Sequence, residues 1–197
     1  MRMLILSDLH LEVWRDTPKQ AQELLRMVQS RFLASQPDLI VLAGEIDVGD
    51  RAVAWADQTF PDLPIVYMPG NHEAYGQKID SLKEKLAEAC SATGHIHFLD
   101  RSELVIGNIR FLGTTLWTDF QLLGPDSCQE AMQWAAVEIN DYRKIRPAKA
   151  GYRKIRPLDV RLVSLVVGLP SADRGVCTID ASVIGVRGIG ARPRWDG

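Results

Sequence analysis

One layout recurs in MLILSDLH (3–10), LIVLAGEID (39–47) and IVYMPGNHE (65–73): a short apolar run leads directly into polar residues. The apolar runs, Met3–Ser7, Leu39–Ala43 and Ile65–Met68, are rich in Leu, Ile and Val. Continuous apolar runs of this length are typical of parallel strands that are covered on both faces. We therefore expect these three segments to form the centre of a parallel sheet.

Amphipathic stretches separate the three runs. Thr17-Pro18-Lys19-Gln20 has the form of a capping box with proline at the first helical position, and apolar residues then recur at helical spacing as far as Phe32. Shorter helices are expected over Arg51–Phe60 and Ile79–Cys90. The resulting βαβαβα order predicts an α/β fold with a parallel sheet.

The pattern changes after residue 94. The segments His95–Leu99, Leu104–Ile106 and Ile109–Leu112 follow one another closely, and Gly107-Asn108 between the last two is typical of a two-residue hairpin. Antiparallel strands are therefore expected after the parallel ones. One more helix is expected over Ser127–Tyr142.

The net charge of −2 is unevenly distributed along the 197 residues. Residues 1–141 hold 11 basic and 21 acidic residues, whereas residues 142–197 hold 12 and 4. The sequence YRKIRP occurs twice in the basic part, at 142–147 and 152–157. Such a stretch either neutralises the phosphates of a nucleic acid or forms a solvated arm, and we favour the solvated arm for residues 142–161.

The last forty residues differ in composition from everything before them. From Leu158 to Gly197 the sequence lacks Lys, Glu and His and is rich in Arg, Gly and Val, with weak strand signals at Val160–Val167 and Ser182–Val186. We therefore divide the chain into a domain over 1–157 and an atypical tail over 158–197. We hypothesise that the tail is an out-of-frame or otherwise aberrant ending of that domain.

Several classes of protein are excluded by the composition. No run approaches the roughly 20 apolar residues of a membrane span, and the apolar run Met3–Leu6 is too short for a signal peptide. The cysteines, Cys90, Cys128 and Cys177, are odd in number and too widely spaced for a disulfide framework or a zinc knuckle. We expect a cytoplasmic protein with no membrane partner.

The polar segments after the three predicted strands carry the candidate chemistry. SDLH (7–10), GEID (44–47) and GNHE (70–73) each follow a strand, and ligands of open α/β sheets bind outside the carboxyl ends of the strands. Asp8 and His10 share one face of an extended segment because alternate residues do. Oxygen and nitrogen donors together suit divalent ions such as Zn, Mn and Fe. A metal site is therefore predicted at this edge of the sheet.

These segments resemble the first three motifs of the calcineurin-like metallophosphoesterases, in order and spacing. FLGTTLWTDF (111–120) and NDYRKIR (140–146) are also similar to segments of a bacterial subgroup, so the resemblance covers about residues 1–157. It implies a layered β-sandwich flanked by helices, and hydrolysis of a phosphate ester by two divalent metal ions (Mn, Zn or Fe). The ligands it implies are Asp8 and His10 for the first ion, Glu45 as the bridge and Asn71 for the second ion. It also implies that His72 is the general acid, with Glu73 beside it.

The sequence departs from the family pattern at two places. Glu45 stands where the family has an aspartate, which displaces the carboxylate by roughly 1.5 Å, so we expect a weakened or altered site in which Asp47 is a less favoured substitute. The late histidines of the family are missing, because no histidine follows His97. His95-Ile96-His97 imitates the late motif, but its alternation favours a surface strand. We expect a fold that lacks part of its C-terminal half.

Three functions remain open from the sequence. The first is a metal-dependent phosphoesterase acting on a phosphomonoester or a phosphodiester, with activity that the departures impair. The second is a non-catalytic binding module on the same fold. The third is nucleic-acid binding through residues 142–161, where eight of the twenty residues are basic.

Overall fold

The computed structural model describes residues 1–146, 154–161 and 176–178, and a four-stranded parallel sheet forms the centre of this part. Its strands follow one another in chain order: β1 (Met3–Leu6), β2 (Leu39–Ala43), β3 (Ile65–Met68) and β4 (Ile96–Phe98). The three parallel strands expected from the apolar runs are confirmed. The expectation that His95–Leu99 is antiparallel was wrong, because β4 pairs parallel with β3 and places Ile96 beside Ile65.

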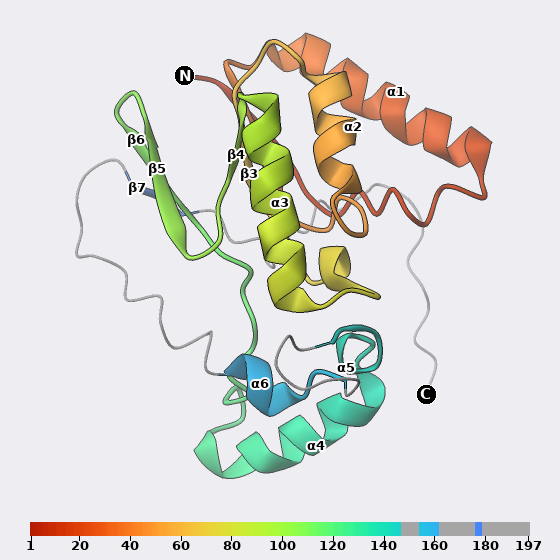
Figure 1. The fold of residues 1–197 in the computed structure, drawn as a ribbon, viewed down its shortest axis with the longest axis vertical. Helices are drawn as coiled ribbons and strands as arrows, with labels where there is room; N and C mark the ends of the chain where they lie inside the picture. Colours follow the sequence, from red (N-terminus) through yellow and green to blue (C-terminus); the bar gives the residue numbers. More distant parts are fainter. Residues whose placement is uncertain (147–153, 162–175, 179–197) are drawn as a thin grey trace.

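Three helices connect the strands and lie on the same side of the sheet: α1 (Pro18–Ser35), α2 (Arg51–Thr59) and α3 (Ile79–Thr93) (Figure 1). α1 begins at Pro18 as the sequence predicts. Its capping box does not form, because the Thr17 hydroxyl donates back to the carbonyl of Trp14 at 3.3 Å and makes no cap hydrogen bond to the helix.

The central strands are apolar throughout because each face meets a different layer. Ile40 and Leu42 of β2 belong to the core beneath the helices, whereas Leu39, Val41 and Ala43 belong to a second core that includes Phe111. Side chains alternate between the faces of a strand, so both sets must be apolar for β2 to be buried along its whole length.

The second core is closed by a small sheet on the opposite side from the helices (Figure 1). β5 (Ser102–Ile106) and β6 (Ile109–Gly113) form the expected antiparallel hairpin, with Gly107 at a φ of +62° in the turn. β7 (Val176–Thr178), which the sequence did not predict, pairs parallel with β6. Two sheets with helices on one outer face form the layered α/β arrangement that was expected.

The helical segment predicted over Ser127–Tyr142 is interrupted. A 3-10 turn, η2 (Pro125–Ser127), precedes α4 (Cys128–Glu138), and the short α5 (Asp141–Lys144) follows after Ile139 adopts an extended conformation with ψ of 128°. Extended backbone cannot continue an α-helix. After this break α5 lies beside the segment that follows β3, where the carbonyl of Lys144 accepts a hydrogen bond from the backbone N–H of Gly76 at 2.9 Å.

The two YRKIRP copies do not form a fully solvated arm in the described part. The basic side chains of the copies that lie in the described ranges are exposed, but Ile145 of the first copy is 0% exposed and Ile155 of the second is 3% exposed. The backbone N–H of Ile155 donates to the carbonyl of Ile145 at 3.0 Å, so equivalent residues of the two copies are paired. The expectation of a solvated arm was wrong for these apolar positions, because burial of isoleucine is favourable.

The end of the described chain also departs from expectation. α6 (Pro157–Arg161) includes Val160, which was expected to begin a strand over Val160–Val167. The remainder of that segment, and the strand expected over Ser182–Val186, lie outside the described residues. Among the helices of the described ranges, none has both the length and the apolar character that crossing a membrane requires.

Candidate metal centre

The loops after β1 and β2 are joined by backbone hydrogen bonds beyond the end of the sheet. The N–H of Asp8 donates to the Gly44 carbonyl at 3.2 Å, and that of His10 donates to the Glu45 carbonyl at 2.9 Å. Asp8, His10 and Glu45 have φ angles of +54°, +46° and +58°, which L-residues adopt at a cost of roughly 1–3 kcal/mol. Strained residues of this kind cluster at functional sites.

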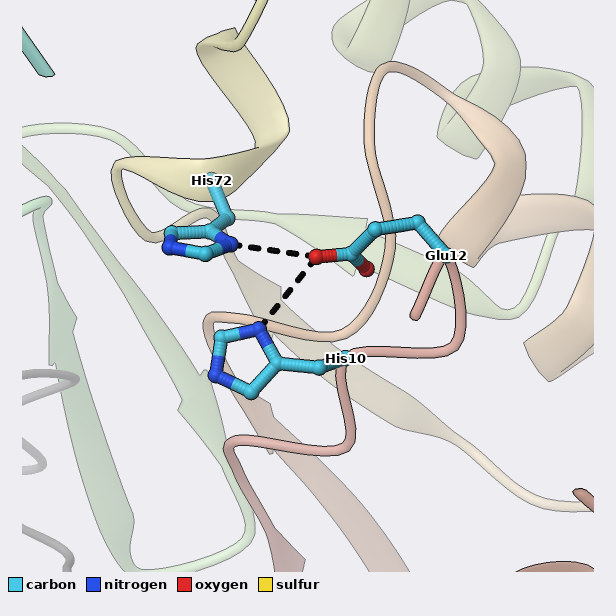
Figure 2. Close-up of side chains that lie close together, drawn as sticks. All are labelled: His10, Glu12 and His72. Carbon is cyan, nitrogen blue, oxygen red and sulfur yellow. Dashed lines mark hydrogen bonds and ion pairs between the residues drawn. The ribbon is translucent and has the colours of Figure 1, made fainter. Parts of the chain in front are cut away.

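Two imidazoles from distant parts of the chain meet at one carboxylate oxygen (Figure 2). Oε1 of Glu12 lies 3.3 Å from Nδ1 of His10 and 3.0 Å from Nδ1 of His72, which is at the start of η1 (His72–Ala74) after β3. The ring centroids of the two histidines are 4.4 Å apart. Each of the three residues offers one ligand atom within 4.8 Å of the others.

Burial and hydrogen bonding act in opposite directions on the Glu12 carboxyl. Burial by itself raises the pKa of Glu12, whereas the hydrogen bonds from His72, from its own backbone and from His10 lower it, and the net pKa is below the usual value. Glu12 therefore carries its negative charge at neutral pH. This charge lies on the side of each imidazole that faces away from Glu45.

Glu45 lies on the other side of the two rings. Its Oε2 is 3.6 Å from Nε2 of His72 and 4.0 Å from Nε2 of His10, while its Oε1 accepts the backbone N–H of Asn71 at 2.9 Å and that of His72 at 3.3 Å. Burial and the neighbouring charge of Glu73 raise the pKa of Glu45, against the opposing effect of His72 and His10. A cation between these groups would favour the ionised form of Glu45.

Glu73 is a structural carboxylate beneath the site. It is 0% exposed, and it accepts the backbone N–H groups of Gly70 at 2.8 Å, Ile46 at 3.0 Å and Glu45 at 3.3 Å, together with the hydroxyl of Tyr67 at 3.3 Å. Burial raises the pKa of Glu73 to about 7, although these backbone donors oppose the shift. Glu73 thus joins the loops after β2 and β3.

α5 orients the side chain of Asn71. Oδ1 of Asp141 accepts hydrogen bonds from Nδ2 of Asn71 at 2.7 Å and from the hydroxyl of Tyr75 at 2.8 Å. The amide oxygen of Asn71 is therefore the atom that can coordinate a cation. The Tyr75 ring stacks on His72 with centroids 4.2 Å apart. Lys144 places its Nζ 4.6 Å from the centre of the Tyr75 ring.

The remaining candidates lie outside this cluster. Asp8 is exposed and is not in the group of three potential ligands. Asp47 is buried against the guanidinium of Arg15 and accepts the N–H of Val48 at 2.6 Å, so its charge already has a partner. His95, which directly precedes the outer strand β4, and His97 within it are both partly buried and lie outside the group of three potential ligands; Nε2 of His95 lies 3.8 Å from Asp57.

Glu12 and Asp141, which contact the candidate ligands His10 and Asn71, were not predicted from the sequence. Glu12 lies in a turn that follows the left-handed backbone of Asp8 and His10, so the strand alternation expected for this segment is not what brings Glu12 to His10. Asp141 reaches Asn71 across 70 residues of sequence, so nothing local indicates their contact.

The donor set fits a divalent cation. Two imidazole nitrogens and carboxylate oxygens are the mixed ligands that Zn, Mn and Fe accept. Oε2 of Glu12 is buried with no hydrogen-bond partner in the described part of the chain, so this oxygen is available to a cation. The residues present therefore fit at least one ion.

The sequence matches one family of known proteins. The sequence profile of the calcineurin-like phosphoesterases matches residues 1–144. Eighteen chains of solved structures match, and one of them, recorded as a crystal structure, is 15% identical with a TM-score of 0.41. The match covers 60% of this chain and 54% of that chain, so this protein spans about half of its length. A search of curated proteins found no match.

The family profile covers nearly three quarters of the chain and includes β1 to β6, the loops that carry His10, Glu45 and His72, and Asp141 of α5. The protein belongs to the calcineurin-like phosphoesterase family.

Proposed function

We propose that the protein is a metal-dependent phosphoesterase that hydrolyses a phosphomonoester or a phosphodiester. The observation that supports this most directly is the convergence of His10 and His72 on Glu45, at Nε2–Oε2 distances of 4.0 and 3.6 Å. Membership of a phosphoesterase family supports hydrolysis over binding alone. The orienting contacts of Asn71 and Glu45 support a site that is organised before any ligand arrives.

His10 and Glu45 would hold a divalent ion, with Asp8 at the exposed side, and Glu45 and Asn71 would hold a second. A divalent ion at this position supplies Lewis-acid chemistry, which neutralises phosphoryl charge and acidifies a water molecule. Glu45 would be the ligand shared by the two ions despite its longer side chain. The backbone of Glu45 has a φ of +58°, and its carboxylate accepts hydrogen bonds from the backbone N–H groups of Asn71 and His72. The side chain is thus held at its backbone and at its carboxylate.

His72 is proposed as the general acid that protonates the leaving oxygen. Its Nδ1 is held by Glu12 and its ring face is covered by Tyr75, so Nε2 is the nitrogen that remains for the substrate. Histidine exchanges protons near neutral pH, and general acids of this type contribute about 10²–10⁴-fold to the rate.

The experiment uses the full chain, stripped of metal and then supplied with Mn²⁺, Zn²⁺ or Fe²⁺. Turnover is measured with 4-nitrophenyl phosphate, bis(4-nitrophenyl) phosphate and an alkyl phosphate. His10→Ala should weaken Mn²⁺ binding. His72→Asn should lower kcat by about 10²–10⁴-fold for the alkyl ester and much less for the nitrophenyl esters, because nitrophenolate leaves without a proton.

His95→Gln and His97→Gln are matched controls, because both histidines lie at β4 and outside the candidate site. The absence of turnover with all three metals would contradict the proposed activity. Mn²⁺ binding that depends on His10 but gives no turnover would favour the non-catalytic binding module. A loss of activity in His95→Gln as large as that in His72→Asn would remove the role assigned to His72.

A further inference from the structure

One carboxylate oxygen contacts both histidines of the candidate centre (Figure 2). Oε1 of Glu12 is 3.3 Å from Nδ1 of His10 and 3.0 Å from Nδ1 of His72. Glu12 follows His10 by two residues, whereas His72 lies 60 residues further along the chain. The Glu12 side chain is only 16% exposed, so water competes weakly for these contacts.

This contact determines which nitrogen of each ring faces the reaction. An ionised carboxylate only accepts hydrogen bonds, so each Nδ1 that approaches it must carry a hydrogen. With Nδ1–H held, a neutral ring presents a lone pair on Nε2, as a metal ligand such as His10 requires, whereas a doubly protonated ring presents Nε2–H, as a general acid such as His72 requires. The Nε2 atoms are the ones that face Oε2 of Glu45, at 4.0 Å for His10 and 3.6 Å for His72.

We propose that Glu12 is a positioning residue shared by His10 and His72: it holds Nδ1–H of both rings and thereby presents Nε2 of one to a metal ion and Nε2 of the other to the leaving oxygen. The assignment rests on the proposed function. A hydrogen bond at one ring nitrogen fixes the tautomer and the orientation of a ligating histidine, and its loss lowers metal affinity by about 10–100-fold. Here one carboxylate fixes two rings that have different roles.

The same cluster admits a competing arrangement, in which Glu12 itself is a metal ligand together with Nδ1 of both histidines. The two arrangements assign opposite nitrogens to the ion. In the positioning arrangement, Nδ1 keeps its hydrogen when the ion binds. In the direct arrangement, Nδ1 loses its hydrogen and Nε2 carries it.

The first measurement is the tautomer of each histidine in the metal-free full chain, read from ¹⁵N ring chemical shifts. Wild type should show hydrogen on Nδ1 of His10 and His72. Glu12→Ala should convert both rings to mixed tautomers, and Glu12→Gln should give a smaller change because its amide oxygen still accepts one hydrogen bond. His95 and His97 should keep their wild-type signals in both variants, which reports that the fold is intact.

The second measurement adds Zn²⁺, a diamagnetic probe. Nδ1–H should persist at His10 in the loaded wild type, and Glu12→Ala should bind Zn²⁺ about 10–100-fold more weakly. Glu23→Gln is the matched control, because Glu23 is an exposed residue of α1, and its Zn²⁺ affinity should be that of wild type. Loss of Nδ1–H on Zn²⁺ binding, or unchanged tautomers in Glu12→Ala, would overturn the positioning role.

These readouts separate the inference from the proposed activity, because neither requires turnover. A chain with the expected tautomers but no hydrolysis would contradict the phosphoesterase proposal and support the role of Glu12. A chain that hydrolyses phosphate esters but has unchanged tautomers in Glu12→Ala would contradict the role of Glu12 alone.

Discussion

Gly70 lies where the candidate centre has no room for a side chain. A Cβ added at this position would overlap Oε1 of Glu45 and lie 2.8 Å from the Glu45 backbone nitrogen. Gly70→Ala should therefore displace the Glu45 carboxylate from the N–H groups of Asn71 and His72 and lower the free energy of unfolding by about 1–3 kcal/mol. Urea denaturation of the metal-free protein measures this change.

A double-mutant cycle shows whether Glu45 is the group that is displaced. In a Glu45→Ala background the contacts of the new Cβ with Oε1 and Cδ of Glu45 disappear, while the contact with its backbone nitrogen remains. Gly70→Ala should then be less destabilising than in wild type. Equal effects in the two backgrounds would show that the clash is with the backbone alone.

Glu73 should contribute more to folding than to chemistry. Both of its oxygens accept hydrogen bonds from backbone N–H groups, so the NH₂ group of Glu73→Gln must face at least one of those donors. We expect a loss of about 2–4 kcal/mol in the free energy of unfolding. Chemical denaturation checks it, with Glu103→Gln on the exposed hairpin strand β5 as the control. A variant as stable as wild type would show that a water or a relaxed loop accepts the extra donor.

His10, Glu45, Asn71 and His72 could be grouped from the sequence because each follows an apolar strand, and parallel strands deliver such residues to one edge. The structure brings the side chains of His10, Glu45 and His72 together at this edge. Asp141 could not be predicted from the sequence, because its contact with Asn71 depends on how α5 returns to the sheet after the break at Ile139. Contacts of this kind are set by tertiary packing, which no local pattern encodes.

At the scale of elements, burial on both faces explains which strands were predicted correctly. β2 and β3 read as continuous apolar runs because one set of alternate residues meets the helices and the other meets the β5–β6 hairpin. β4 is an outer strand, and its alternation of His and apolar residues imitates a half-exposed antiparallel strand. The pairing direction of β4 is set by the right-handed connection through α3, not by its composition.

The paired YRKIRP copies give a prediction at the same scale. Ile155→Ala should lower the free energy of unfolding by about 2–4 kcal/mol, because Ile155 is buried in the main core. Leu158→Ala, three residues further along, removes a side chain that is 53% exposed and should change stability by less than about 0.5 kcal/mol. Thermal or urea denaturation of both variants measures the contrast, and equal effects would indicate that Ile155 does not pack as described.

At the scale of the whole molecule, the layers on the two sides of the parallel sheet protect its interior from solvent. Cys90 of α3 is 1% exposed, and burial raises the pKa of its thiol from 9.0 to about 12. Because the thiol pKa is higher in the folded state than in the unfolded state, the stability that the protonated thiol contributes is fully present below pH 9 and is lost as the pH rises towards 12. The stability difference between wild type and Cys90→Ala should therefore narrow between pH 8 and pH 10.5, as urea denaturation can measure.

Alkylation provides an independent check on the protection of Cys90. With iodoacetamide at pH 8, Cys90 should react only as fast as the molecule unfolds, and the rate should rise with urea in parallel with the unfolded fraction. Rapid alkylation of Cys90 in the native protein, read from its peptide by mass spectrometry, would contradict a raised thiol pKa and would point to local opening of α3.

The pairing of Ile145 with Ile155 bears on how the length of this protein can change. The copies begin ten residues apart, so excision of residues 142–151 joins Asp141 to Tyr152 and regenerates Asp-Tyr-Arg-Lys-Ile-Arg-Pro without altering the reading frame. The shortened chain would share every residue before and after the excised segment with the longer one. The difference in free energy of unfolding between the two lengths is the change in stability that the duplication makes.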